Sequence, residues 1–335
     1  MIHRLLSMFV LALLSQSALA DDIKSLLSDY ASARSTFASV SATFNYSVDQ
    51  VIYNGGDILF EDSAHKSADF RRDNELFEFI IGDVPDSSLT KETSTITSRI
   101  WDGEKEYQVY QFPNDVYRVT VMKDNTIKKS LSLNLIYSNL TGVFHGDTKS
   151  FDEILSIASD GTSSLRYETV EGSKCIVLES DNSHGNYQVW IDPDRGYNIV
   201  KAIITKGPED IYFGSPLNSY EFGPSRQDTT SLSKLAGTRT MTEAVIKIDN
   251  VVLERQGGLW VSVRSDHEKM LKFSDGVINS LKIKCKVEEL EVAPDFDKLN
   301  AFKVKVPNGT RVRISEFPGI RYEWQQGRII PFEDK

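Results

Sequence analysis

The chain has 335 residues and a formal net charge of −10 at pH 7. This acidic balance argues against nucleic acid as a partner and against non-specific binding to an anionic membrane surface, because both require a cationic face. The length suits one large β-rich domain or two smaller ones, with enough chain to bury a sizeable core.

The N-terminus has the pattern of a cleaved export signal. Arg4 precedes an apolar run from Leu5 to Leu14, and Ala18-Leu19-Ala20 fits a small-residue cleavage site before Asp21. The apolar run is too short to span a bilayer, and no later stretch reaches that length. We therefore predict a signal peptide over residues 1–20 and a periplasmic or secreted mature chain that does not span a membrane.

The mature chain opens with a predicted helix over residues 22–38. Its apolar residues recur at helical spacing, and Arg34 is the polar exception on the same stripe. Such a one-sided stripe must pack against something apolar. The stripe consists of Ile23, Leu26, Leu27, Tyr30 and Phe37.

Half-buried strands follow the helix. Residues 40–49 alternate strictly between apolar and polar side chains, and residues 67–73 place Ala68, Phe70 and Arg72 on one face. Asn54-Gly55-Gly56 and Asp102-Gly103 predict tight turns between antiparallel strands. We expect a long loop over residues 82–97.

The middle of the chain predicts two helices and then a further hairpin. Residues 130–140 are weakly periodic, whereas residues 150–159 begin with a capping box made by Ser150 and Glu153. The hairpin, residues 185–204, turns at Asp192-Pro193-Asp194-Arg195-Gly196. Its first strand carries Tyr187 and Val189 on one face.

The remaining chain predicts a long surface loop or lid over residues 206–238 and a C-terminal β region over about 239–335. Strands are expected at 242–255, 259–264, 277–292 and 302–306, followed by short turns rich in glycine and proline.

No catalytic signature is present in the sequence. The histidines of the mature chain lack metal-ligand spacing, and the chain has neither a nucleophile elbow nor a phosphate-binding loop. We therefore expect no catalytic residue, no metal and no cofactor. Cys175 and Cys285 lie in separate strand-like runs, so they either pair in a disulfide or remain two buried thiols.

The order of the elements resembles the periplasmic lipoprotein carriers of the LolA/LolB-like family, whose fold is shared by RseB. Ser67-Ala68-Asp69-Phe70-Arg71-Arg72 looks like the family's extended Pro-x-x-Phe-Arg strand, and Trp101-Asp102-Gly103 looks like its Asp-Gly hairpin. The segment 172–204, which contains Trp190-Ile191-Asp192-Pro193, looks like its later hairpin. The resemblance covers residues 22–205 best, and the closing segment 306–324 resembles the C-termini of large exported relatives.

The resemblance implies a mainly β fold with some α structure, in one domain over residues 21–335. A strongly curved antiparallel sheet, or half-barrel, would be covered by the N-terminal helix and by short internal helices. In the carriers an arginine on an early strand holds the closed state. Arg71 or Arg72 matches that position, and strand parity favours Arg72 because it shares a face with Phe70.

Three functions remain open at this stage. The first is a non-catalytic binding protein that holds a lipid, a lipoprotein acyl chain or another apolar ligand. The second is an envelope interaction domain with a filled core, and the third is a hydrolase whose site is assembled from distant residues. For the first, the candidate cavity residues are Leu27, Tyr30, Phe37, Phe44, Tyr46, Phe70, Arg72, Tyr187 and Val189.

Overall fold

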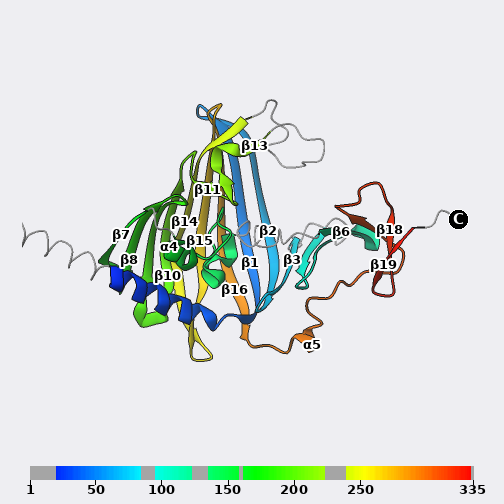
Figure 1. Cartoon of the computed structure of the whole chain (residues 1–335), viewed down its shortest axis with the longest axis horizontal. Helices are drawn as coiled ribbons and strands as arrows, with labels where there is room; N and C mark the ends of the chain where they lie inside the picture. The colour runs from blue at the N-terminus through cyan, green and yellow to red at the C-terminus, as the bar shows by residue number, and fades with distance from the viewer. Residues whose placement is uncertain (1–19, 84–94, 123–134, 158–160, 223–238, 333–335) are drawn as a thin grey trace, which may run out of the picture.

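The computed structural model describes residues 20–83, 95–122, 135–157, 161–222 and 239–332. Most of them form one large, strongly curved antiparallel sheet that remains open, as predicted (Figure 1). Its strands are β1 (Ser39–Asn54), β2 (Asp57–Asp73), β3 (Leu76–Asp83), β4 (Ile96–Trp101), β5 (Glu106–Phe112), β6 (Val116–Met122), β7 (Thr162–Val170), β8 (Ser173–Asn182), β9 (Gly185–Asp192), β10 (Asn198–Lys206), β13 (Glu221–Phe222), β14 (Arg239–Gln256), β15 (Leu259–Phe273), β16 (Val277–Val292), β17 (Thr310–Ile314), β18 (Tyr322–Gln325) and β19 (Arg328–Pro331).

Pairing places the strands in the spatial order β7-β8-β9-β10-β14-β15-β16-β1-β2-β3-β4-β5-β6-β17-β18-β19. The short strand β13 pairs with the start of β14. Among the strands of the described residues, only β6 and β17 run parallel. Most neighbours are consecutive hairpins, whose turns use residues with positive φ such as Gly56 and Gly258.

The strands from residue 239 to 292 lie in the middle of the sheet. β14 pairs with β10, and β16 pairs with β1 along almost its whole length. The C-terminal part of the chain therefore joins the two earlier groups of strands. β15 also continues to Phe273, beyond the strand expected to end at residue 264.

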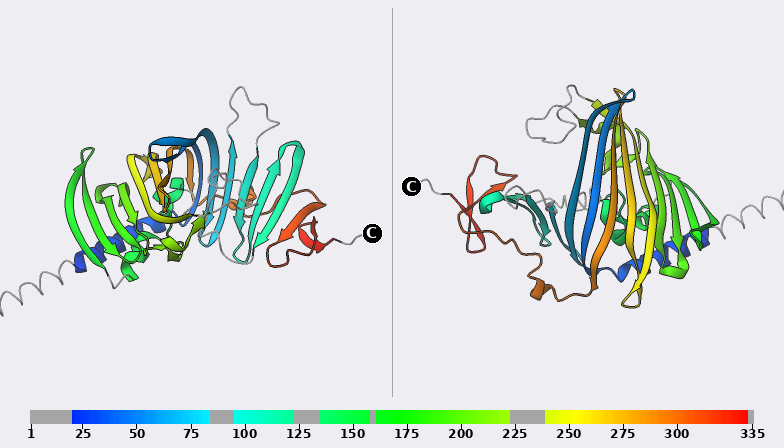
Figure 2. Two further views of the ribbon diagram at one scale, coloured as in Figure 1. Left: turned by 90° about the horizontal axis from the view of Figure 1, so that it is seen from above. Right: turned by 180° about the vertical axis from the view of Figure 1, so that it is seen from behind.

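A layer of helices covers the concave face of this sheet. The N-terminal helix, described over residues 20–35, crosses the ends of the strands, while α4 (Phe151–Ile157) and the short helices η2 (Leu135–Tyr137) and α3 (Ser138–Thr141) lie against the face itself (Figures 1 and 2). The capping box of α4 forms, because the Ser150 backbone N–H and hydroxyl both donate to Glu153 Oε2, each at 3.1 Å. Part of the weaker predicted helix, residues 130–134, lies outside the described residues.

Two hydrophobic clusters form on opposite faces of the sheet. The large one fills the concave side beneath the helices. The small one lies at the far end, where Val109, Val119 and Val121 meet Val312 and Trp324. Val304 and Val306 pack on this second cluster from irregular chain, so the strand predicted at residues 302–306 is not formed. Alternate side chains can pack on a cluster without forming a strand, because a strand also needs a neighbouring backbone with which to pair.

Candidate functional site: the plugged concave face

Aromatic side chains of three neighbouring strands gather at the centre of the concave face. Register places Phe44 of β1 opposite Ala68, and Phe70 of β2 opposite Phe79 of β3, so these rings lie on the same side of the sheet. Phe70 and Phe79 have centroids 5.2 Å apart. Alternating side chains on a curved sheet produce such a continuous apolar surface.

A short segment fills the space above these rings. We call residues 135–141, which comprise η2 and α3, the plug. Its Tyr137 ring lies 4.8 Å from both Phe70 and Phe79 and 5.4 Å from Phe44. The plug therefore covers the aromatic surface made by these three rings. The space left beside it, next to Asn139 and Cys285, is only about 10 Å³.

The plug buries polar groups that lack partners. Within the described part of the chain, Tyr137 Oη, Ser138 Oγ and Asn139 Oδ1 are buried and accept or donate no hydrogen bond. Burial also raises the pKa of Tyr137 well above its ordinary value. Three successive residues of this kind are unusual, because buried polar groups are normally paired.

Arg34 of the N-terminal helix ties the plug to the sheet. Its guanidinium donates to the Asn139 backbone oxygen at 2.6 Å and to Asn198 Oδ1 on β10 at 3.0 Å. The same group lies over the Phe37 ring, 4.9 Å from the centroid. Burial lowers the pKa of Arg34, and the nearby Tyr30 and Asp152 oppose that shift. These two charged hydrogen bonds link the N-terminal helix, the plug and β10, and we call them the latch.

An open hollow of about 340 Å³ leads from solvent to the end of the plug. It lies between the N-terminal helix, the β2–β3 turn and α4. Charges of both signs line it, including Arg72, Lys149 and Glu153, and Arg34 and Thr141 form its inner end.

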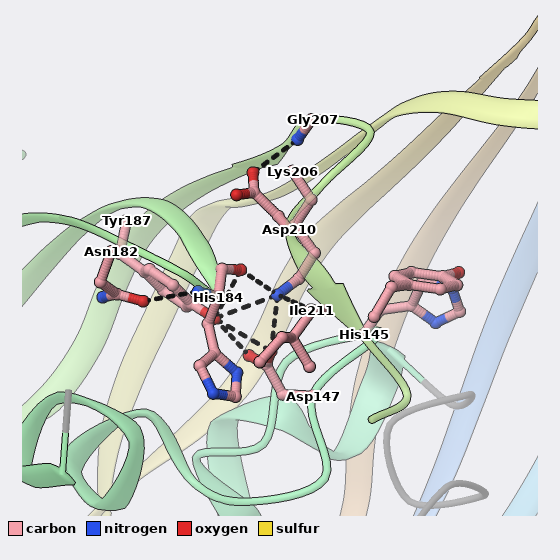
Figure 3. Close-up of polar contacts among 10 residues, drawn as sticks. His145, Asp147, Asn182, His184, Tyr187, Lys206, Gly207, Asp210 and Ile211 are labelled. Atoms are coloured by element: carbon pink, nitrogen blue, oxygen red, sulfur yellow. Dashed lines mark hydrogen bonds and ion pairs between the residues drawn. The ribbon is translucent and has the colours of Figure 1, made fainter. Parts of the chain in front are cut away.

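A second polar cluster holds the loop that contains Asp147, as Figure 3 shows. Lys206 Nζ on β10 donates to Asp147 Oδ1 at 2.8 Å, and Tyr187 Oη donates to the same atom at 2.9 Å. Lys206 also donates to the backbone oxygens of His184 and Ile211. Burial raises the pKa of Asp147, against the attraction of Lys206. Both charged side chains are completely buried and neither lines the hollow, so a substrate in the hollow would not reach them.

The predicted site residues separate into two groups. The eight apolar and aromatic candidates are buried in the single large cluster: Leu27, Tyr30, Phe37, Phe44, Tyr46, Phe70, Tyr187 and Val189. Arg72 instead lies at the hollow, where its Nε donates to the Asn74 backbone oxygen of its own hairpin and its guanidinium covers the Phe77 ring.

Arg34, the plug and Lys206 were not among the predicted site residues. The signal for Arg34 was present, since an arginine on the apolar stripe of a covering helix needs buried acceptors. Cys175 and Cys285 are both free and buried, which corresponds to the second alternative drawn from the sequence. No cluster of three or more potential metal ligands occurs within the described ranges.

No family model matches the sequence, and no curated protein is detectably similar to it. Solved structures similar to it include a DUF1329 family protein from Desulfovibrio piger, at 12% identity and a TM-score of 0.38, covering 79% of this chain and 93% of that one. A LolA superfamily protein from Nitrosomonas europaea has 12% identity and a TM-score of 0.31, with 77% and 89% covered. The MucA/MucB complex of Pseudomonas aeruginosa gives 11% identity and a TM-score of 0.23, with 82% and 99% covered.

These matches include the LolA family that the sequence resembles. The arrangement expected from that resemblance, a curved antiparallel sheet with helices over its concave face, is the one observed. With TM-scores below 0.5 these likenesses carry no argument, so function has to be argued from the geometry of this chain. No helix in the described segments is long and apolar enough to cross a membrane.

Proposed function

We propose that this chain is a non-catalytic, exported binding protein that holds an apolar chain on its concave face when the plug moves aside. The ligand class is a lipid or the acyl chain of a lipoprotein. The observation that carries the proposal is the plug itself, whose residues 137–139 each bury a polar atom without a partner over an aromatic surface.

Keeping the plug in place has a cost in free energy. Each buried polar group without a partner costs about 1–3 kcal/mol. An acyl chain in the position of Tyr137 would contact the same rings of Phe44, Phe70 and Phe79 without burying a hydroxyl. Exchange of the plug for a ligand would therefore conserve apolar contacts and return three polar groups to water.

The hollow suits the entrance and the polar end of such a ligand. Its inner end meets the plug at Thr141, and its rim carries Arg72, Lys149 and Glu153. A lipid places its apolar chain and its polar group in different environments, and this path from a charged rim to an aromatic interior provides both.

Ligand uptake tests the proposal directly. We expect native mass spectrometry of the gently purified protein to show co-purified lipid, and a fluorescent long-chain fatty acid to bind with 1:1 stoichiometry. Arg34→Met removes the latch and should increase the rate of uptake. Arg255→Met is the matched control, because Arg255 is exposed in the β14–β15 hairpin, where its side chain donates to the Gly258 backbone oxygen.

The two natural cysteines report the movement of the plug. Cys285 lies beneath Ile136 and Leu140 of the plug, and burial raises its pKa to about 12, so its thiol is protected while the plug is in place. Cys175 is also buried, but it lies on β8, which β9, β10, β14 and β15 separate from β16 and Cys285. In Arg34→Met we expect faster alkylation of Cys285 and an unchanged rate at Cys175. Equal acceleration at both thiols would indicate global unfolding and contradict a gate.

A second candidate function is an envelope interaction domain with a filled core. The observation that favours it is the close packing around Tyr137, which leaves only about 10 Å³ beside the plug. If neither the natural chain nor Arg34→Met binds the fatty acid while both remain folded, this second function replaces the first.

A further inference from the structure

The C-terminal strands form a corner at the end of the molecule farthest from β7. We use the name C-terminal corner for β17, β18, β19 and the turn over residues 315–321. Figures 1 and 2 place it at one end of the long axis, with the described part of the N-terminal helix toward the other end. The register of Val312 opposite Tyr322 and of Tyr322 opposite Pro331 brings the end of β17, the start of β18 and the end of β19 together.

Arginines collect on one face of this corner. Val312 and Trp324 point into the small hydrophobic cluster, so Arg311 and Arg313 point to the other face by alternation. Arg311 lies directly opposite Arg118 of β6, which is also exposed. Like charges on facing positions destabilise a sheet, so their presence here has a cost in folding stability.

These guanidinium groups have no anionic partner in the described part of the chain. The ion pairs there include none of Arg118, Arg311, Arg313, Arg321 and Arg328, and all five are exposed. Arg118 lies over the Phe112 ring, and Glu323 lies opposite Arg311 in the register. Residues 310–332 contain four arginines against two glutamates, a net charge of +2 within a chain of −10.

Large apolar side chains are exposed at the same corner. Phe317 is 54% exposed, Ile320 51% and Phe332 48%. The turn that carries the first two is hydrogen-bonded, with Phe317 N–H donating to Ile314 O and Ile320 N–H to Phe317 O, both at 3.1 Å. Phe332 N–H donates to Arg321 O, which brings the third ring to the same end of the strands. Clustered apolar residues rimmed by charge mark an interaction surface.

A hollow of about 310 Å³ lies between these two features. Arg311, Arg321 and Phe332 line it, together with Gly309, Tyr322 and Glu323. A planar guanidinium binds phosphate oxygens in pairs, and two of them at one hollow suit a phosphate monoester or diester.

We propose that the C-terminal corner docks on the surface of an anionic phospholipid bilayer. Phe317, Ile320 and Phe332 enter the boundary between headgroups and acyl chains, and Arg311 and Arg321 bind headgroup phosphates. Exposed apolar side chains surrounded by cations are the combination that binds a bilayer interface, since each alone gives weak attachment. Docking there turns the acidic remainder of the protein away from the membrane.

Vesicle flotation of the full mature chain tests this docking. Vesicles of phosphatidylcholine alone are compared with vesicles containing phosphatidylglycerol, at low and at physiological salt. We expect binding only to the second kind, with weaker binding as salt screens the arginines. Arg311→Gln combined with Arg321→Gln should weaken binding about 30-fold, because each cation near an anionic surface contributes a factor of about five to six. Phe317→Ser combined with Ile320→Ser should weaken binding without altering the salt dependence.

The matched control is Lys282→Gln combined with Lys284→Gln, which makes the same change in net charge on exposed positions of β16. This pair should bind as the natural chain does. Equal loss in the control and in the arginine pair would show that net charge alone matters, and would overturn the proposal. Absence of binding to any vesicle would also overturn it. If polyglutamate binds at the corner and vesicles do not, the surface belongs to an acidic protein partner instead.

Discussion

At the scale of single residues, two buried tyrosines contrast in how their hydroxyl groups are satisfied. Tyr137 Oη has no partner in the described chain, whereas Tyr187 Oη donates to Asp147 and accepts from Lys206. Tyr137→Phe should therefore stabilise the protein by about 1 kcal/mol, because it removes an unsatisfied group and keeps the ring. Tyr187→Phe should destabilise it by about 1–3 kcal/mol, because it leaves a buried charge pair with one partner fewer.

Urea unfolding of the two variants measures both effects. The two substitutions remove the same atom from the same residue type, so each is the control for the other. Under the proposed function, Tyr137→Phe should also slow fatty-acid uptake, since a plug without an unsatisfied hydroxyl leaves its place less readily. Destabilisation by both substitutions to the same extent would show that Tyr137 Oη is satisfied after all.

His267 gives the concave face a dependence on pH. Burial lowers its pKa to about 4, and its Nε2 lies 2.7 Å from Ser265 Oγ. An unfolded histidine has a pKa of about 6.5, so the stability due to the neutral ring is complete above pH 6.5 and is lost as the pH falls from 6.5 toward about 4. Between pH 7 and pH 5 this loss amounts to about 2 kcal/mol. His267→Gln should therefore reduce the difference between the unfolding free energies at pH 7 and pH 5. If that difference is unchanged in the variant, groups other than His267 cause it.

At the scale of elements, the N-terminal helix is expected to contribute to stability through its buried stripe. Leu26, Leu27 and Tyr30 are buried against the main cluster, while Lys24 of the same helix is exposed. Leu27→Ala should cost about 2–5 kcal/mol, the usual range for a buried leucine. Lys24→Ala should change stability by less than about 0.5 kcal/mol. Thermal unfolding of both variants checks this, and equal melting temperatures would place the helix in solvent.

The elements that the sequence predicted best are those with local signals. The helix, the alternating strand at residues 40–49 and the turn at Gly55-Gly56 are all present, because periodicity and turn chemistry depend on near neighbours. The insertion of β14–β16 between β10 and β1 left no such signal. Phe44 pairs with Val287, and nothing within either segment specifies a partner so distant in the chain.

The candidate site was predictable in part, for the same reason. Strand parity places Phe44, Phe70 and Tyr187 inside, and all three are buried. Parity does not identify the acceptors of an arginine, which for Arg34 are an oxygen of the plug and a side chain of β10. The place of Arg72 depends on the path of the loops around it. Their polar composition resembles that of any surface turn, so the sequence does not predict that path. The burial of Lys206 likewise requires a partner, Asp147, from a separate loop.

At the scale of the whole molecule, the distribution of charge carries more information than its sum. The net charge of −10 argues against an anionic membrane as a partner, yet the C-terminal corner, residues 310–332, carries a local charge of +2. Electrostatic attraction falls off within about 10 Å in salt. It therefore depends on the charge of the local patch and not on the net charge of a long molecule. The acidic remainder would then favour one orientation on such a surface.

The middle strands of the sheet determine which parts of the chain can fold without the others. A fragment of residues 21–222 lacks β14, β15 and β16, so Ala202 and Ile204 of β10 lose Ile248 and Ile246, and β1 loses its pairing with β16. Two long apolar edges would be exposed at the centre of the sheet, and such edges aggregate. We expect this fragment to be insoluble or to unfold without cooperativity.

A fragment of residues 21–292 is the matched comparison. It keeps the strand order from β7 to β6 and loses only the C-terminal corner with its preceding segment, which uncovers Val109, Val119 and Val121 of the small cluster. It should fold cooperatively with a lower melting temperature, because the main cluster remains intact. Circular dichroism during heating distinguishes the two fragments. Cooperative unfolding of the shorter fragment would show that β1 to β10 form a self-sufficient unit, to which residues 239–292 are an addition and not the connecting centre.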